Sequence, residues 1–274
     1  MYRNTFLSVM FLACCFNGSL CAQSDAQIYE RTCDAKTYPF SDPSPVATPN
    51  NSYYPYFRFD GFSMQAQEKQ WKMVVLENDY VKLTVTPEIG GKIWGAIDKV
   101  NNKEFVYTNG VVKFRDVAMR GPWTSGGIEF NFGIIGHAPT CSTPIDYLTK
   151  KNVDGSVSCH IFSYEWITRT VWNVEINLPK DKAYFTTHTT WFNQSSIDQP
   201  YYQWMNAGYA TKTGTRFYYP GTYSIGHSGD LHPYPIDEEG RDVSWYDNNN
   251  FGASKSLHII GDYNDYFGIY WHNE

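Results

Sequence analysis

Apolar side chains recur at every second position in many short segments of this 274-residue chain, and no long segment repeats them with a helical period of about 3.6 residues. The segment at residues 81–86 alternates in this way, and so does the one at residues 170–178. Turn residues such as Gly90 and Gly91 follow the first of these segments. Many short strands with turns between them and no helices predict an all-β sandwich.

The alternating pattern begins at Trp71, and it divides the chain into three parts. Prolines at positions 39, 43, 45, 49 and 55 interrupt any helix or central strand, yet residues 23–70 are too aromatic for a disordered linker. We expect residues 23–70 to be an extended segment that packs onto a β-sandwich domain at residues 71–274. Residues 267–272 predict a core strand very near the end of the chain, so we expect a sandwich that is incomplete at its C-terminus.

Residues 1–22 are typical of a signal peptide. Arg3 precedes an apolar run at residues 6–13, and small residues lead to a cleavage position near Ala22. The run is too short to span a bilayer, and no second run of roughly 20 apolar residues follows it. We expect a soluble exported protein, periplasmic or secreted, without a transmembrane segment. An outer-membrane lipoprotein anchored through Cys14 is the alternative.

Composition and residue spacing argue against several kinds of partner. The net charge of −6 is unsuited to nucleic acid, whose phosphates need a basic surface. The seven histidines show no spacing that is typical of zinc sites, and the acidic residues match no calcium loop. No glycine-rich phosphate loop precedes a helix. We therefore expect no metal and no cofactor. Cys33, Cys141 and Cys159 follow the signal and allow at most one disulfide.

The stretch at residues 120–146 concentrates the chemistry of the chain. If residues 128–132 form a strand, Ile128, Phe130 and Phe132 face one side, and Glu129 and Asn131 face the other. The flanking glycines let the backbone bend sharply. The side chains expected to converge on one concave surface are Arg120, Trp123, Glu129, Asn131 and His137. A cation, a flat aromatic ring, a carboxylate and an imidazole suit a sugar, which has apolar faces and a rim of hydroxyls.

A glycoside-hydrolase-like enzyme is the first functional hypothesis. Hydrolysis of a glycosidic bond needs two carboxyl groups, one on each side of the bond. Glu129 is the first candidate, because its strand position points it away from the core. Asp237 and Asp242 are candidates for the second, because they lie in a loop-rich region where a cleft can form.

A non-catalytic carbohydrate-binding protein is the second hypothesis, and the sequence leaves open whether the chain is an enzyme. The chain has 22 Tyr, 17 Phe and 9 Trp, which suit either a β-rich core or a surface on which sugar rings stack. The candidate stacking residues are Trp123, Trp204, Trp245 and Tyr246, and the candidate hydroxyl-binding residues are Arg120, Asn206 and Asp242. Either hypothesis makes an oligo- or polysaccharide the partner.

Two resemblances support a sugar-related fold. The run LTVTPEIGGKIW at residues 83–94 resembles the opening of the galactose-mutarotase-like sandwich, which aldose 1-epimerases share with several glycosidase and lyase families. Residues 76–80, 113–115, 120–132 and 202–206 resemble more closely an exported bacterial domain family of unsettled chemistry. Its longer members continue into tetratricopeptide-type repeats. This second resemblance covers nearly everything after residue 28 and implies a mutarotase-like β-supersandwich.

The same resemblance places aldose 1-epimerase third among the functions. Arg120 and Gly121 look like the place where epimerases hold a sugar-contacting histidine and glycine. Asn206 stands where they carry their catalytic acid, and an amide cannot supply a proton at neutral pH. Their general base is a glutamate on a late strand, and we expect this chain to end before a matching strand.

Overall fold

The computed structural model describes residues 24–40, 61–116, 122–133, 137–165, 168–200, 202–210, 212–226, 229–249, 258–259 and 266–273. Strands dominate these residues, and their only helices are two 3₁₀ turns, η1 (Pro139–Cys141) and η2 (Tyr246–Asn248). This confirms the prediction of a mostly β protein. No helix in these ranges is long and apolar enough to cross a bilayer. The signal-like segment with Cys14 lies outside the described residues.

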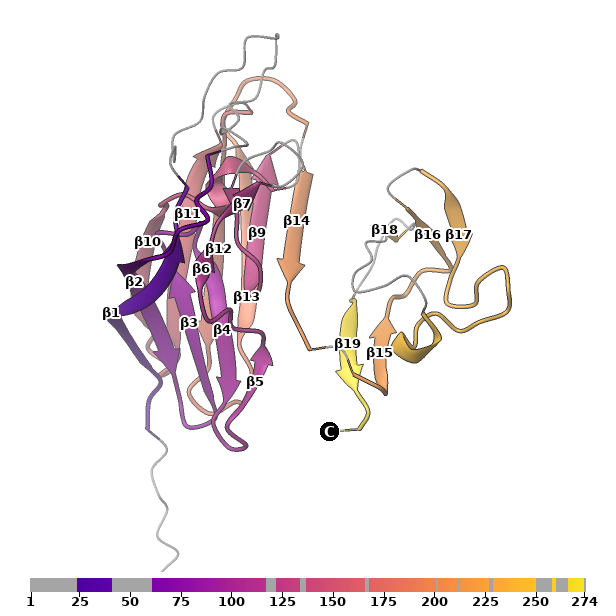
Figure 1. The fold of residues 1–274 in the computed structure, drawn as a ribbon, viewed down its shortest axis with the longest axis horizontal. Helices are drawn as coiled ribbons and strands as arrows, with labels where there is room; N and C mark the ends of the chain where they lie inside the picture. The colour runs from indigo at the N-terminus through magenta and orange to yellow at the C-terminus, as the bar shows by residue number, and fades with distance from the viewer. Residues whose placement is uncertain are drawn as a thin grey trace, which may run out of the picture.

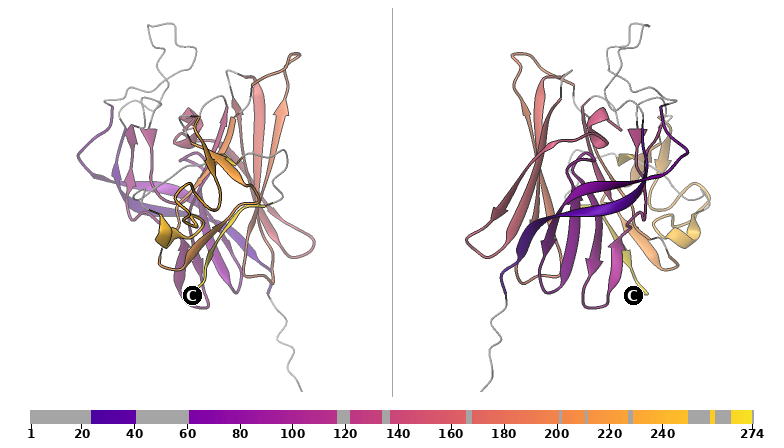
Figure 2. Two further views of the ribbon diagram at one scale, coloured as in Figure 1. Left: turned by 90° about the vertical axis from the view of Figure 1, so that its right-hand side faces the viewer. Right: turned by 60° about the vertical axis from the view of Figure 1, so that its left-hand side comes forward.

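A curled eight-stranded sheet forms the body of the molecule (Figures 1 and 2). Its strands run in the order β14, β9, β4, β3, β2, β1 and β6, and β5 pairs beside β4. Their bounds are β1 (Gln27–Tyr38), β2 (Gln67–Glu77), β3 (Val81–Thr86), β4 (Lys92–Asp98), β5 (Lys103–Val106), β6 (Val112–Lys113), β9 (Ile128–Gly133) and β14 (Tyr202–Ala207). This order places β9, which carries the predicted site, between β4 and the edge strand β14.

A second sheet of four antiparallel strands faces the first. It runs in chain order through β10 (Asp146–Lys151), β11 (Val157–Glu165), β12 (Thr170–Leu178) and β13 (Thr186–Asn193). Every second residue of β12 is buried, as the sequence predicts. Trp172 of this sheet stacks on Phe132 of β9, with ring centroids 4.6 Å apart. One apolar core cluster therefore joins the two sheets.

The N-terminal segment contributes a strand to the main sheet. Residues 27–38 form β1, which pairs with β2 from Gln27 opposite Glu77 to Thr37 opposite Gln67. The segment is thus a strand of the main sheet, and the expected boundary at residue 70 falls inside β2. The prolines, which argued against a strand, begin at Pro39, one residue after β1 ends. Residues 41–60 lie outside the described residues.

Shorter strands complete the fold. β7 (Arg115–Asp116) pairs with β8 (Pro122–Trp123). After β14 come β15 (Thr215–Tyr218), paired with β19 (Gly268–Trp271), and a small sheet of β16 (Tyr223–Ile225), β17 (Leu231–Pro233) and β18 (His258–Ile259). The prediction of a core strand at residues 267–272 is wrong, because Phe267 is 66% exposed and Tyr270 56%. Among the described residues, β19 pairs with β15 alone, in a sheet of two strands.

Candidate functional site

Strand β9 separates an apolar side from a polar side. Ile128, Phe130 and Phe132 join the core between the sheets, as the alternation predicts. Glu129 and Asn131 point to the other side, yet they too are buried, with exposures of 1% and 0%. The depth was not expected, because a strand with one polar face is usually solvated on that face. Lys92 of β4 and the residues His137 and Ala138 cover the polar pair instead.

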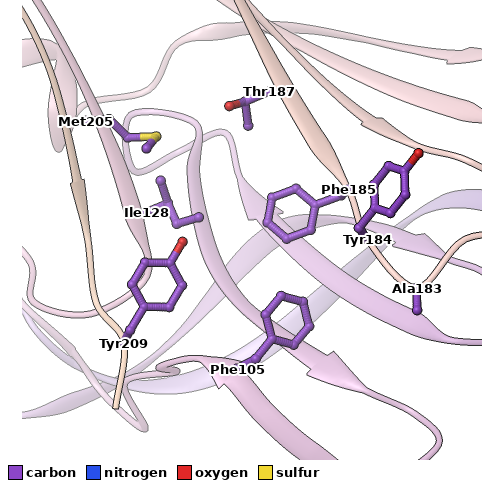
Figure 3. Close-up of a pocket in the computed structure, with 8 residues that line it drawn as sticks. All are labelled: Phe105, Ile128, Ala183, Tyr184, Phe185, Thr187, Met205 and Tyr209. Atoms are coloured by element: carbon purple, nitrogen blue, oxygen red, sulfur yellow. The ribbon is translucent and has the colours of Figure 1, made fainter. Parts of the chain in front are cut away.

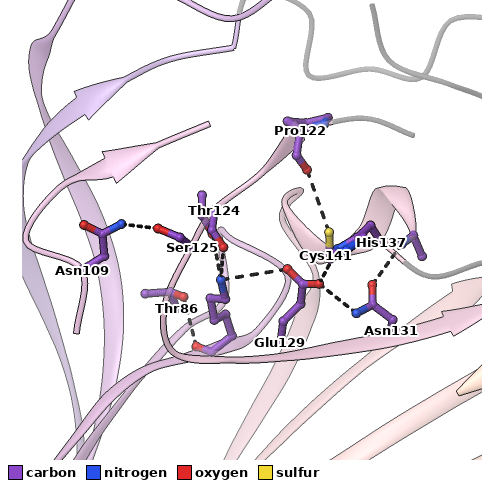
Figure 4. Close-up of polar contacts among 11 residues, drawn as sticks. Thr86, Asn109, Pro122, Thr124, Ser125, Glu129, Asn131, His137 and Cys141 are labelled. Atoms are coloured by element: carbon purple, nitrogen blue, oxygen red, sulfur yellow. Dashed lines mark hydrogen bonds and ion pairs between the residues drawn. The ribbon is translucent and has the colours of Figure 1, made fainter. Parts of the chain in front are cut away.

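The carboxylate of Glu129 is the centre of a buried polar cluster (Figure 4). Its Oε1 accepts a hydrogen bond from Asn131 Nδ2 at 2.8 Å and lies 3.0 Å from Nδ1 of His137. Its Oε2 lies 4.0 Å from the ammonium group of Lys92 on β4. Three of these residues, Glu129, Asn131 and His137, were expected to converge, and the structure brings them together.

Asn131 links the carboxylate to the segment that carries the imidazole. Its Nδ2 donates a hydrogen bond to Glu129, while its Oδ1 accepts a hydrogen bond from the backbone N–H of Ala138 at 3.0 Å. His137 itself has a φ of +52°, a left-handed conformation that is uncommon outside glycine. Such conformations persist where surrounding contacts impose them, and they cluster at functional sites. The position of the imidazole is therefore fixed from both its side chain and its backbone.

Lys92 is the member of the cluster that sequence reasoning missed. Its side chain is 1% exposed, and its Nζ donates to the carbonyl oxygen of Thr124 and, at 3.0 Å, to Thr124 Oγ1. Burial lowers the pKa of Lys92 below its usual value, and the nearby Glu129 charge partly opposes that effect. Cys141 is also buried beside Glu129, and burial raises the pKa of its thiol well above the usual range. The only signal for Lys92 was a charged residue at the start of an otherwise apolar strand.

Two buried polar atoms, one in this cluster and one on a neighbouring side chain, have no hydrogen-bond partner among the described residues. They are Oε2 of Glu129 and Nε1 of Trp123. Buried polar groups without partners reduce stability by about 1–3 kcal/mol each. A buried ion pair likewise contributes little net stability, since desolvation offsets its attraction. The cluster is therefore poorly explained as a stabilising device, and an arrangement of this kind marks a candidate site.

Aromatic rings frame the imidazole. The ring of His137 meets the ring of Trp204 at a centroid distance of 4.7 Å and that of Trp123 at 5.9 Å, both edge to face. Trp204 lies opposite Asn131 across the pairing of β14 and β9, and Asn206 lies opposite Glu129. Directly opposed residues share a face of the sheet. His137, Trp123, Trp204 and Asn206 are all partly exposed and form what we call the aromatic rim.

The other predicted residues have different surroundings. Asp237 accepts hydrogen bonds from its own turn and pairs with Arg241 at 2.7 Å. Asp242 accepts hydrogen bonds from Ser244, and its carboxylate lies 3.9 Å from Arg216. These contacts fix the turns that follow β17, whereas the partners of Glu129 are Asn131, His137 and Lys92.

Trp245 and Tyr246 belong to the same turn region. Trp245 packs against Arg216, whose guanidinium carbon is 4.9 Å from the ring centroid, and against His272. Tyr246 begins η2. Arg120 lies outside the described residues.

Figure 3 shows a cavity of about 290 Å³ that Ile128 of β9 helps to line. Ile128 faces the core, so the cavity lies on the side of β9 opposite to Glu129. Ile128 and Met205 line it together with aromatic rings of Phe105, Phe185 and Tyr209. It therefore opens from the apolar core side rather than from the polar cluster. Within the described ranges, His, Cys, Asp and Glu side chains form no group of three that could hold a metal ion. The thiols of Cys33, Cys141 and Cys159 are free.

A protein-family model described as "Domain of unknown function (DUF5107)" matches residues 48–274 of the chain. The chain belongs to the DUF5107 family. The match covers the polar cluster, the aromatic rim and all strands from β2 onward, whereas β1 precedes it. It agrees with the resemblance of this sequence to a domain family of unsettled chemistry.

A solved structure is similar to this DUF5107 chain. It is the crystal structure of a TPR-domain containing protein from Parabacteroides distasonis, with a TM-score of 0.68 and 24% sequence identity. The similarity covers 81% of this chain and 38% of that one, so the DUF5107 chain spans well under half of the longer protein. At this level of identity the likeness concerns the fold alone.

Proposed function

We propose that this DUF5107 domain is an exported carbohydrate-binding domain with a galactose-mutarotase-like fold, and that the aromatic rim is its binding surface. One observation carries the proposal: the partly exposed imidazole of His137 contacts the rings of both Trp123 and Trp204. Flat aromatic surfaces bind the apolar faces of sugar rings, and an imidazole and an amide bind hydroxyls. Asn206 supplies the amide on the same face as Glu129.

The burial and the positions of the candidate carboxylates favour binding over hydrolysis. A glycosidase needs two carboxyl groups that reach the substrate. Glu129 is buried, and Asp237 and Asp242 hold turns elsewhere. Glycoside-hydrolase-like chemistry is the second candidate, because a carboxylate that holds an imidazole is a common arrangement in acid-base catalysis. Aldose 1-epimerase stays third, because Asn206 cannot donate a proton at neutral pH.

Export and the wider architecture are part of the same proposal. The signal-like pattern of residues 1–22 supports export to the periplasm or the medium, with a lipid anchor at Cys14 as the alternative. Two facing sheets, one of them curled, support a mutarotase-like sandwich. The likeness to a longer TPR-domain containing protein supports a role as one domain of a larger chain.

A glycan array tests the proposal. We expect the wild-type chain to retain a defined set of oligosaccharides, and Trp204→Ala to weaken that binding about tenfold or more, which corresponds to about 1.4 kcal/mol. The matched control is Phe192→Ala, an exposed aromatic on the other sheet, which should bind as the wild type does. Failure of the wild type to retain any glycan, or equal affinity of the two variants, would contradict the proposal.

A further inference from the structure

We infer that His137 exchanges a proton with the bound carbohydrate and that Glu129 is the residue that positions it. The inference rests on the proposed carbohydrate binding and deepens it. It reverses the roles that the sequence favours, in which Glu129 acts on the substrate and His137 only binds it.

The hydrogen bond between the two side chains sets the tautomer of His137. In this inference the carboxylate oxygen Oε1 of Glu129 accepts the hydrogen bond, and Nδ1 of His137, 3.0 Å away, donates it and carries the hydrogen. In a neutral imidazole the other nitrogen, Nε2, then has a free lone pair. A histidine held in this way by a carboxylate is oriented to accept a proton at Nε2.

Burial separates the two roles. The side chain of Glu129 is 2% exposed, whereas that of His137 is 13% exposed. A group that touches a carbohydrate must be reachable from the binding surface, and of this pair His137 is the reachable one. Glu129 acts through the imidazole and through Asn131, which fixes the carboxylate and the backbone next to His137.

The charges around the pair suit the transfer of a proton to His137 and back. Lys92 lies on the Oε2 side of the carboxylate and Cys141 lies beside it, while His137 contacts Oε1. The thiol is neutral, because burial raises its pKa well above the usual range. When His137 gains a proton, its positive charge is therefore next to an anion rather than next to the ammonium group. The carboxylate stabilises the imidazolium without taking the proton itself.

The step is a simple transfer. A hydroxyl O–H bond of the carbohydrate, or of a water molecule beside it, breaks as the proton forms an N–H bond with Nε2. The electron pair of the broken bond stays on the oxygen. The reverse transfer returns the proton to an oxygen, so the protein ends unchanged. General acid-base catalysis of this kind contributes about 10²–10⁴ in rate.

The matched variants are His137→Gln, Glu129→Gln and His160→Gln. His160 is the control because it also lies beside a carboxylate, with Nε2 3.7 Å from Glu175, but on the other sheet. Each is tested for folding, for binding to the glycans retained on the array, and for turnover across pH. The turnover probes are p-nitrophenyl glycosides for cleavage and D-glucose and D-galactose for anomer exchange.

We expect wild-type turnover of at least one probe. A plot of its rate against pH should have one rising limb, the part of the curve in which the rate increases with pH. His137→Gln should lower the rate at saturating probe about 10²-fold or more and remove that limb. Glu129→Gln should move the limb to lower pH, because the imidazolium loses its negative partner. A merely structural glutamate would not move it. His160→Gln should match the wild type.

Failure of the inference is distinguishable from failure of the proposed function. Glycan binding without turnover of any probe, or a His137→Gln profile that keeps the limb, overturns the proton-transfer role and leaves carbohydrate binding standing. An absence of any glycan binding overturns both. If His137→Gln does not fold, nitrogen chemical shifts of the wild-type imidazole decide: a protonated Nε2 with a bare Nδ1 at about pH 8 overturns the inference.

Discussion

The ammonium group of Lys92 is buried next to the carboxylate of Glu129 and the hydroxyl of Thr124. Replacing it by methionine keeps the volume and removes the charge, so the buried Glu129 loses its counter-charge. We expect Lys92→Met to lower the free energy of unfolding by about 3–5 kcal/mol. The double variant Lys92→Met with Glu129→Gln should recover part of that loss, because neither charge is then left alone. Urea unfolding measures both.

The control for this prediction is Lys103→Met, which removes an exposed lysine on β5. We expect it to change the free energy of unfolding by no more than about 0.5 kcal/mol. A Lys92→Met variant as stable as this control would show that the ammonium group and the carboxylate are not coupled.

At the scale of single residues, the sequence predicts which side of a strand a side chain faces better than it predicts how deeply that side chain is buried. The alternation in residues 128–132 correctly places Glu129 and Asn131 on the side away from the core. It cannot predict that both are buried, because the covering groups come from Lys92 on β4 and from residues near His137. Pairing between distant strands decides those neighbours, and local pattern carries no information on it. Lys92 was missed for the same reason.

Glu77, at the end of β2, contacts side chains of the neighbouring strands β1 and β3. It accepts a hydrogen bond from Tyr29 of β1 at 3.0 Å and pairs with Lys99 at 2.7 Å and Lys82 of β3 at 3.5 Å. Burial alone would raise the pKa of Glu77, but the hydrogen bonds from Lys99 and Tyr29 outweigh it and hold that pKa below its usual value. Its stabilising contribution is therefore complete above a pH of about 4.5 and is lost as the pH falls through the lowered pKa.

We expect Glu77→Gln to lower the free energy of unfolding by about 1 kcal/mol at pH 7, since the contacts are partly exposed. The difference from the wild type should shrink below a pH of about 4.5 and vanish in stronger acid. Urea unfolding at a series of pH values measures it. A difference that is constant with pH would mean that the carboxylate charge of Glu77 does not contribute.

At the scale of elements, strands with a strict apolar alternation are predictable and polar ones are not. β12 alternates without exception, so the apolar face predicted for residues 170–178 is the buried face in the structure. β1 has the sequence QIYERTCDAKTY, and most of its residues are exposed or partly so. Its strand character comes from backbone pairing with β2 rather than from an apolar face. The prolines after Tyr38 then made the whole segment look irregular.

At the scale of the whole molecule, the question is where the folding unit begins. The family match starts at residue 48, but β1 ends at Tyr38 and lies between β2 and β6 in the main sheet. Without β1, the backbone of β2 becomes an unpaired edge. Cys33 and Ala35, which pack against the cluster that contains Trp71, would be lost as well. Exposed edges with apolar neighbours promote association.

We therefore expect a chain that starts at Gly61 to be less stable than one that starts at Ser24, and to associate at concentrations where the longer chain stays monodisperse. Removal of residues 1–23 alone is the control, because β1 and its pairing are kept. Size-exclusion chromatography and urea unfolding compare the two chains. Equal stability and equal elution behaviour would mean that β1 is an accessory strand and that the folding unit coincides with the family match. A lower midpoint for the shorter chain would instead extend the DUF5107 folding unit of this protein to Gln27, because the sheet that positions Glu129 and Lys92 would then depend on a strand that precedes the family match.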